Sequence, residues 1–324
     1  MSQHSIAGFA AAALSSLTPG QVDFLRTLPK AELHAHLNGS IPLPVLQDLS
    51  REYLQEHSSQ NDARAEAVRA GIERLSQGVV LTEIHEFFGL FPAIYTLTST
   101  PQSLAKAARG RLQYIEAVLD EVEKFSVEQA ALIVSLDRRM TPAVASECVG
   151  CAIKLRDAGR RVVGVDLCGD VQAGNVADFE AHFRKAKAAG LGVTLHIAEI
   201  PETPADEIQQ LLSYEPDRLG HATFLDETSK ELVRNSSSCI EICLSSNLLC
   251  KTVDNLDVHH IRYYLRHDHP IAICTDDILP FRNSLLGEYA LLMAAPPLGL
   301  GLSEKEIEKV ARMGMGCRFP VKYQ

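Results

Sequence analysis

The chain has 324 residues, of which 46% are hydrophobic and 22% are charged, and its net charge is −10. This composition is typical of a globular protein with a sizeable core. The negative charge argues against a surface for a nucleic-acid polymer, which needs clustered basic side chains, but leaves a mononucleotide ligand open. No apolar run reaches the roughly 18–20 residues that cross a bilayer, and no basic segment precedes the apolar residues 10–14. We therefore expect no membrane span and no signal peptide, and a cytoplasmic location.

Short apolar segments alternate with helical patterns along most of the chain. Residues 1–20, rich in Ala and Ser, are expected to form a tail or a first helix. No linker divides residues 21–324, which we expect to form one domain. The expected strands are residues 32–37, 131–136, 162–167, 193–198, 218–221, 240–244 and 271–275. The expected helices include residues 142–158, 176–189, 205–212 and 228–235. This alternation predicts an α/β fold, a parallel sheet covered by helices, as in a (β/α)₈ barrel.

Seven strands are one fewer than such a barrel needs, and the gap lies between residues 37 and 131. Residues 81–125 have a helical pattern almost throughout, with no strand between 104–109 and 112–124. A missing strand leaves unpaired backbone groups at two sheet edges, at about 1–3 kcal/mol for each buried group. We therefore expect this chain to be less stable and less active than a version that has the strand.

Histidines and carboxylates stand at the ends of the predicted strands. His34 and His36 lie two residues apart, so that a strand would place both imidazoles on one face. The other candidates follow later strands: His196, His221, Asp276 and Asp277. The carboxyl ends of parallel strands in a barrel face one mouth, where three histidines and a carboxylate could bind one zinc ion. The His-x-His pair alone would also fit two histidines of a barrel interior.

Five segments in order resemble the adenosine deaminase family. The first runs from Leu28 to Ser40 and contains His34-Ala35-His36-Leu37-Asn38-Gly39. The others are residues 195–199, 220–223, 245–247 and 274–277. The resemblance extends from about residue 24 to 300 and is greatest to the adenosine deaminase-like branch, the N6-methyl-AMP deaminases. It implies a (β/α)₈ barrel with one zinc ion per chain, bound by four ligands: His34, His36, His196 and Asp276.

The resemblance also implies roles for residues that do not bind the metal. Glu199 corresponds to the proton donor to purine N1, and such a carboxyl group needs a raised pKa to be protonated at pH 7. His221 and Asp277 correspond to the groups that orient the attacking water, which the metal acidifies, and accept its proton. Gly169 corresponds to a glycine whose backbone N–H meets purine N3, although a simple strand-end turn would also explain it. His36 and Asp277 are expected near the substrate as well.

Asn38 bears on the choice of substrate. Classical members of the family have an aspartate there, which binds the ribose 5′-hydroxyl and would repel a 5′-phosphate by about 1–4 kcal/mol. An asparagine has no charge and can donate a hydrogen bond to phosphate, although a conservative polar exchange is the alternative. Asp137 corresponds to a further substrate position, or forms a salt bridge with Arg138 or Arg139.

Three features depart from the adenosine deaminase-like branch. Its strand with a Thr-Pro-Arg motif is absent, and Arg109-Gly110-Arg111 leads straight into a helical pattern. Tyr95 stands where a histidine is usual, and residues 313–317 are unlike the closing helix of the family.

We predict a monomeric, zinc-dependent hydrolase that converts N6-methyl-AMP, or a related 6-aminopurine nucleotide, to the 6-oxopurine. The ligand would be a small purine nucleotide or nucleoside. Two alternatives stay open: a deaminase of free adenosine, and an inactive zinc-binding isoform or paralogue that serves as an interaction module.

Overall fold

The computed structural model describes residues 6–57, 63–98 and 110–321. The chain divides into two compact units, and the division falls within one strand. The first unit comprises residues 1–103 and 242–316, and the second comprises residues 104–241 and 317–324. The prediction of one domain over residues 21–324 stays a prediction.

Six strands follow one another in the sheet in chain order. They are β1 (Leu132–Asp137), β2 (Val162–Cys168), β3 (Gly192–Ile197), β4 (Arg218–His221), β5 (Cys239–Ile242) and β6 (Ile271–Ile273). The pairs from β1 to β5 are parallel. Six of the seven predicted strands are thus confirmed.

The remaining prediction, a regular strand over residues 32–37, is wrong. It forms only an isolated parallel bridge between Ala35 and Asp276. The physical reason lies next to it, because the Glu32 carboxyl group accepts the backbone N–H groups of His34 and Thr275. These donors are therefore not used in a strand ladder.

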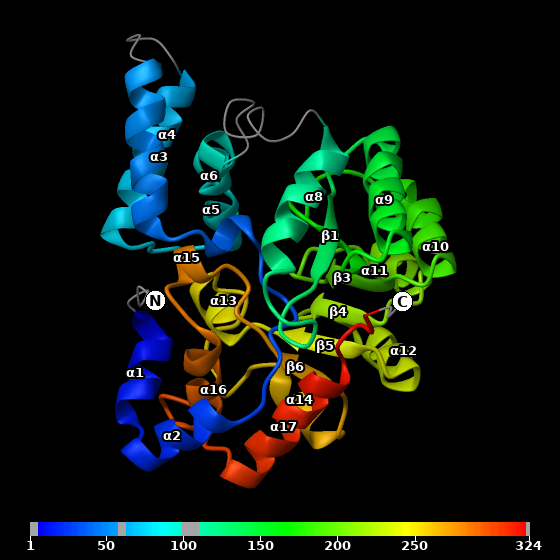
Figure 1. Cartoon of the computed structure of the whole chain (residues 1–324). Helices are drawn as coiled ribbons and strands as arrows, with labels where there is room; N and C mark the ends of the chain where they lie inside the picture. Colours follow the sequence, from blue (N-terminus) through cyan, green and yellow to red (C-terminus); the bar gives the residue numbers. More distant parts are fainter. Residues whose placement is uncertain (1–5, 58–62, 99–109, 322–324) are drawn as a thin grey trace. The chain divides into compact units, whose positions relative to one another are not determined.

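Helices follow the strands of the second unit. They are α8 (Arg111–Val122), α9 (Pro142–Asp157), η2 (Val176–Phe179), α10 (Glu180–Ala188), α11 (Ala205–Leu212) and α12 (Glu227–Ser236). Thr141 caps α9 by accepting the N–H of Val144. The first six residues of β2 are buried, as expected for a parallel strand covered on both faces. Figure 1 shows α9 and α10 next to β1–β3. The predicted helices of this region are confirmed.

The first unit has helices from both ends of the chain. They are α1 (Gly8–Ser16), α2 (Pro19–Thr27), η1 (Asn38–Ser40), α3 (Leu43–Glu56), α4 (Ala63–Gln77), α5 (Ile84–Phe88), α6 (Phe91–Thr98), α13 (Leu244–Leu249), α14 (Ile261–Arg266), α15 (Ile278–Phe281), α16 (Leu285–Met293) and α17 (Glu304–Gly316). Leu46 of α3, Val68 of α4 and Ile94 of α6 share one apolar core, and α3 and α4 lie side by side (Figure 1). The N-terminal segment is a helix from Gly8, with Ala10 and Ala13 buried.

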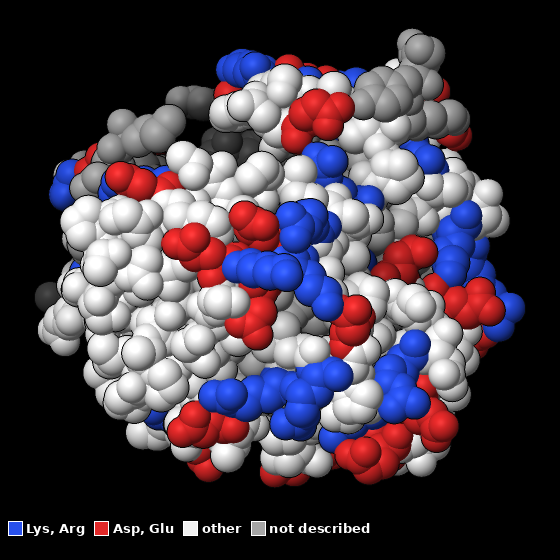
Figure 2. Space-filling view, turned by 90° about the horizontal axis from the view of Figure 1, so that it is seen from below, with Lys and Arg blue, Asp and Glu red and all other residues white. Residues whose placement is uncertain are grey.

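No strand occurs in residues 38–57, 63–98 and 110–131, in agreement with the predicted gap. The predicted helical segment 104–109 lies outside the described residues. Residues 313–316 do form the end of a helix, α17, which packs near Ala272 of β6 through Gly314. None of the described helices is long and apolar enough to span a bilayer. Figure 2 shows basic and acidic side chains intermixed on the face seen from below, where no uniformly basic field is present.

Candidate active site and metal centre

In the first unit, two of the predicted histidines meet the predicted aspartate. The Nε2 atoms of His34 and His36 lie 3.7 and 3.3 Å from Oδ1 of Asp276. In a tetrahedral zinc site with bonds of about 2.0–2.1 Å, ligand atoms lie roughly 3.3–3.4 Å apart. His34 and Asp276 are buried, and His36 is half-buried. The geometry and the donor types therefore fit a metal ion.

The backbone around Asp276 is held in an unusual conformation. Its N–H donates to the His34 carbonyl oxygen at 2.8 Å, and its own carbonyl accepts the N–H of His36 at 3.4 Å. Asp276 has φ of +59°, a left-handed conformation that a non-glycine residue adopts at a cost of about 1–3 kcal/mol. Asp276 follows the end of β6 by three residues, and its carboxylate lies beside the two histidines.

Asp277 lies beside the same group. Its carboxylate oxygen, one from Asp276 and a ring nitrogen of His36 fall within 4.8 Å of one another. A Cβ atom added to Gly39 would overlap the Asp277 side chain, so the glycine allows this carboxylate to lie directly against η1. The turn that contains Asn38 is therefore next to Asp277.

In the second unit, His196 and His221 stand at the ends of β3 and β4. Nδ1 of His196 lies 3.0 Å from Oδ1 of Asp166, and both residues are buried. An ionised Asp166 fixes the Nδ1–H tautomer of His196 and leaves Nε2 as a donor for a metal, the usual support of a metal-binding histidine. Nε2 of His221 lies 3.9 Å from the Glu199 carboxylate, and Glu199 is only 7% exposed. A nucleotide base that reached Glu199 would thus meet a largely dry carboxyl group.

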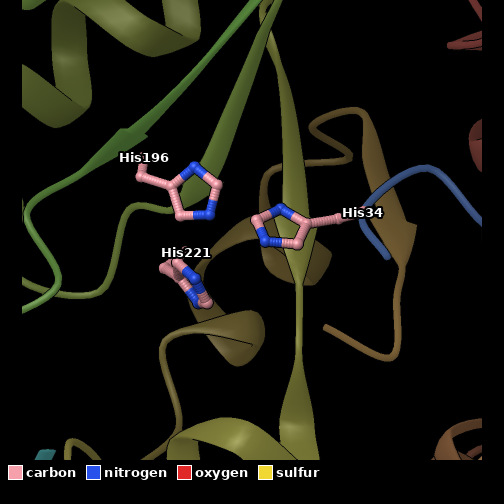
Figure 3. A group of neighbouring side chains, drawn as sticks. All are labelled: His34, His196 and His221. Carbon is pink, nitrogen blue, oxygen red and sulfur yellow. The ribbon is translucent and has the colours of Figure 1, made fainter. Parts of the chain in front are cut away.

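Two histidines of the second unit lie together. The side chains of His196 and His221 are buried, and their ring centroids are 5.3 Å apart. Figure 3 shows these two rings close to each other. His196 is a predicted ligand, and His221 is the residue to which we assigned a role with the water.

Gly169 and Asp137 occupy neighbouring strand ends in the second unit. Gly169 follows β2 with φ of +100°, which favours glycine, and a Cβ there would lie 2.9 Å from the Asp137 carboxyl carbon. Asp137 binds Arg139 through both oxygens, at 2.8 Å to Nε and 2.5 Å to a terminal nitrogen. Arg138 instead pairs with Glu207. The salt-bridge alternative for Asp137 is therefore present, and its role toward a substrate stays a prediction.

Sequence reasoning missed two residues of the site. Cys243 follows β5, and its sulfur belongs to a group with His34 and Asp276. Burial, and then the charge of Asp276, raise the pKa of this thiol well above its usual value. Asp166 was missed because β2 is otherwise apolar. A lone carboxylate inside an apolar strand was the available signal.

Comparison with known proteins identifies the family. The family model described as adenosine deaminase matches residues 95–320. N6-Methyl-AMP deaminase of Danio rerio is 33% identical over 330 residues, covering 92% of this chain and 93% of that protein. N6-mAMP deaminase of Arabidopsis thaliana is 30% identical over 342 residues, covering 92% and 94%. A crystal structure of Arabidopsis ADAL complexed with IMP has a TM-score of 0.79 at 30% identity, covering 92% of this chain and 94% of that one.

The parallel α/β fold and the candidate metal ligands are those of a hydrolytic deaminase of purines with a metal site. The chain belongs to the adenosine deaminase family. The predicted family and fold class are confirmed.

Proposed function

We propose that the protein is a zinc-dependent deaminase of purine nucleoside 5′-monophosphates and that N6-methyl-AMP is its preferred substrate. Water and N6-methyl-AMP would give IMP and methylamine. The observation that carries the proposal is the contact between η1 and Asp277, which lies beside the candidate ligands. Because Gly39 has no side chain, the Asp277 carboxylate lies directly against the turn that contains Asn38. The relatives named N6-methyl-AMP deaminases cover more than nine-tenths of the chain and support the same substrate.

The zinc ligands in this proposal are His34, His36, His196 and Asp276. All four are imidazoles or carboxylates, the donors that zinc accepts in catalytic sites. When bound, the metal would lower the pKa of a water molecule, so that hydroxide is available to attack carbon near neutral pH. Asp166 holds the ring of His196 in the tautomer that leaves Nε2 free to bind a metal.

The remaining residues move protons and orient the base. Glu199 donates a proton to purine N1, which makes C6 more electrophilic, while His221 and Asp277 orient the water and accept its proton. A C6–O bond forms, and the C6–N bond then breaks as the amine leaves with a proton. Gly169 presents its backbone N–H to N3 at a strand end where a side chain would meet Asp137.

The 5′-phosphate is assigned to the side of Asn38. At this position the side chain has no charge to repel a phosphate, and its amide can donate a hydrogen bond. Free adenosine has no phosphate to make this contact. We therefore propose the nucleotide, and not the nucleoside, as the preferred substrate.

The test is a comparison of four substrates with one enzyme: N6-methyl-AMP, AMP, N6-methyladenosine and adenosine. We expect the highest kcat/KM on N6-methyl-AMP, and one zinc per chain by elemental analysis. H34A and H196A should lose the zinc, whereas H267A, at an exposed histidine outside the candidate groups, should keep it. Faster turnover of the two nucleosides would identify an adenosine deaminase. Zinc binding without turnover of any of the four would identify an inactive relative.

A further inference from the structure

The two segments that carry the ligands of the first unit are joined by one side chain. Oε1 of Glu32 accepts the backbone N–H of His34 at 3.0 Å. Oε2 of the same carboxyl group accepts the backbone N–H of Thr275, also at 3.0 Å. These donors are 241 positions apart along the chain, and each one belongs to a ligand or to the residue before a ligand.

This contact adds to the backbone hydrogen bonds that join His34, His36 and Asp276. The first segment is not a regular strand, and only one isolated bridge, between Ala35 and Asp276, is formed there among the described residues. Asp276 itself has the left-handed φ of +59°, which persists only where neighbouring groups enforce it. Glu32 binds the backbone N–H of Thr275, the residue directly before Asp276.

A side-chain amide, itself bound by a buried carboxyl group, holds the next peptide unit, between Thr275 and Asp276. The carbonyl oxygen of Thr275 accepts a hydrogen bond from the Asn283 side chain at 2.9 Å. The same Asn283 nitrogen donates to Glu288 at 3.0 Å, and Glu288 also accepts the N–H of Ser245. Thr275 is thus held on both sides, through its N–H by Glu32 and through its C=O by Asn283.

We propose that Glu32 is a positioning residue that sets the distance between His34 and Asp276 and thereby the affinity of the site for zinc. Both of its oxygens accept hydrogen bonds from backbone donors, which is the contact of a positioning residue. The inference rests on the proposed zinc site. A glutamine at position 32 can accept only one of the two N–H groups, because its NH₂ group would face the other donor. One ligand segment is then released.

The test compares the zinc dissociation constants of the wild type, E32Q and E32D, measured at pH 8 by competition with a chromogenic chelator. We expect E32Q to bind zinc about 10–100-fold more weakly, the usual effect of removing a group that orients metal ligands. The visible spectrum of the Co²⁺-substituted protein should also change, because the ligand geometry changes. E32D keeps the charge but is one methylene shorter, and should also bind more weakly. It carries the test if E32Q does not fold.

The matched control is E241Q. Glu241 is a buried carboxylate of β5 in the second unit that binds Arg218 at 2.7 Å and accepts a hydrogen bond from Thr194 at 3.0 Å. It should lower the unfolding free energy of the metal-free protein without changing the zinc dissociation constant. Wild-type zinc affinity and Co²⁺ spectrum in folded E32Q or E32D would overturn the role of Glu32. Absence of stoichiometric zinc in the wild type would instead overturn the proposed function.

Discussion

Replacing Gly39 with alanine isolates the contact between the Asn38 turn and Asp277. Gly39 is part of the 3₁₀ turn η1 and is not among the glycines with positive φ, so the backbone itself should accept alanine. The added methyl group would overlap the Asp277 carboxylate and would lie 2.8 Å from the Asp277 Cβ. Because 3.4 Å is the closest ordinary contact, that Cβ must move by about 0.6 Å, and the carboxylate by more.

A misplacement of about 1 Å in an active site can lower the rate by roughly 10²-fold. We therefore expect G39A to lose about 10²-fold in kcat/KM, equivalent to about 2.7 kcal/mol of transition-state stabilisation. The assay is the loss of purine absorbance at saturating and limiting N6-methyl-AMP, together with zinc content. Steric crowding should also lower the unfolding free energy by about 1–3 kcal/mol.

The matched control for this substitution is G150A. Gly150 lies within α9, and a Cβ there would meet no atom within 4 Å. Alanine should raise helix stability by about 0.8–1 kcal/mol and leave turnover unchanged. Wild-type kcat/KM in G39A, with a normal zinc content, would show that Asp277 has no fixed position in the reaction and refute the reasoning.

E199Q should keep its zinc but turn over roughly 10²–10⁴-fold more slowly, and near-normal activity would mean that the N1 proton has another source. N38D should weaken use of the monophosphate more than use of the nucleoside, with a difference that added salt reduces; equal losses would place Asn38 away from the phosphate. Burial raises the pKa of Glu288 from 4.5 to about 7, so its contribution to stability is fully present below about pH 4.5 and is lost as the pH rises through about 7. The unfolding free energy of E288Q in urea, relative to that of the wild type, should therefore rise by roughly 3 kcal/mol between pH 4.5 and 8. A difference between the two proteins that does not change with pH would contradict this. Finally, a Cβ at Gly164 would lie 2.6 Å from the Phe319 ring, so G164A should cost about 1–3 kcal/mol of unfolding free energy in the wild type but less in an F319A background. Equal costs in both backgrounds would show that the ring is not the obstacle.

The sequence was sufficient to predict the strands that obey regular periodicity. β2 and β3 are buried apolar runs with helices around them, and their pattern identifies them without the structure. The segment with His34 and His36 also has a strand-like pattern, in which apolar and polar residues alternate. Among the described residues it nevertheless pairs only at Ala35. The reason is a side chain, because Glu32 takes up the backbone donors of two segments that are distant in sequence. A periodicity argument treats such a residue as one more polar position.

The candidate site could be predicted as a set of residues but not as a geometry. The resemblance to the family implied one ligand set that includes His34, His36 and Asp276, and in the structure the two histidines lie 3.7 and 3.3 Å from the Asp276 carboxylate. The sequence could not show that Asp166 supports His196, because that contact joins two strands whose pairing register must be known first. The lower stability expected from the strand gap also stays a prediction, because it depends on a comparison with a longer chain.

Left-handed backbone at strand ends is the feature that sequence reasoning had least chance of finding. Ala198, His221, Ala222 and Asp276 all have φ between +50° and +60°. None of them is a glycine, so no residue type indicates the turn, and each such conformation costs about 1–3 kcal/mol. Two of the four are candidate site residues, and Ala198 immediately precedes Glu199. The strands therefore stop abruptly just where their side chains have to converge. This local cost must be offset by the contacts that hold the site together, and around Asp276 those contacts include the two hydrogen bonds of Glu32.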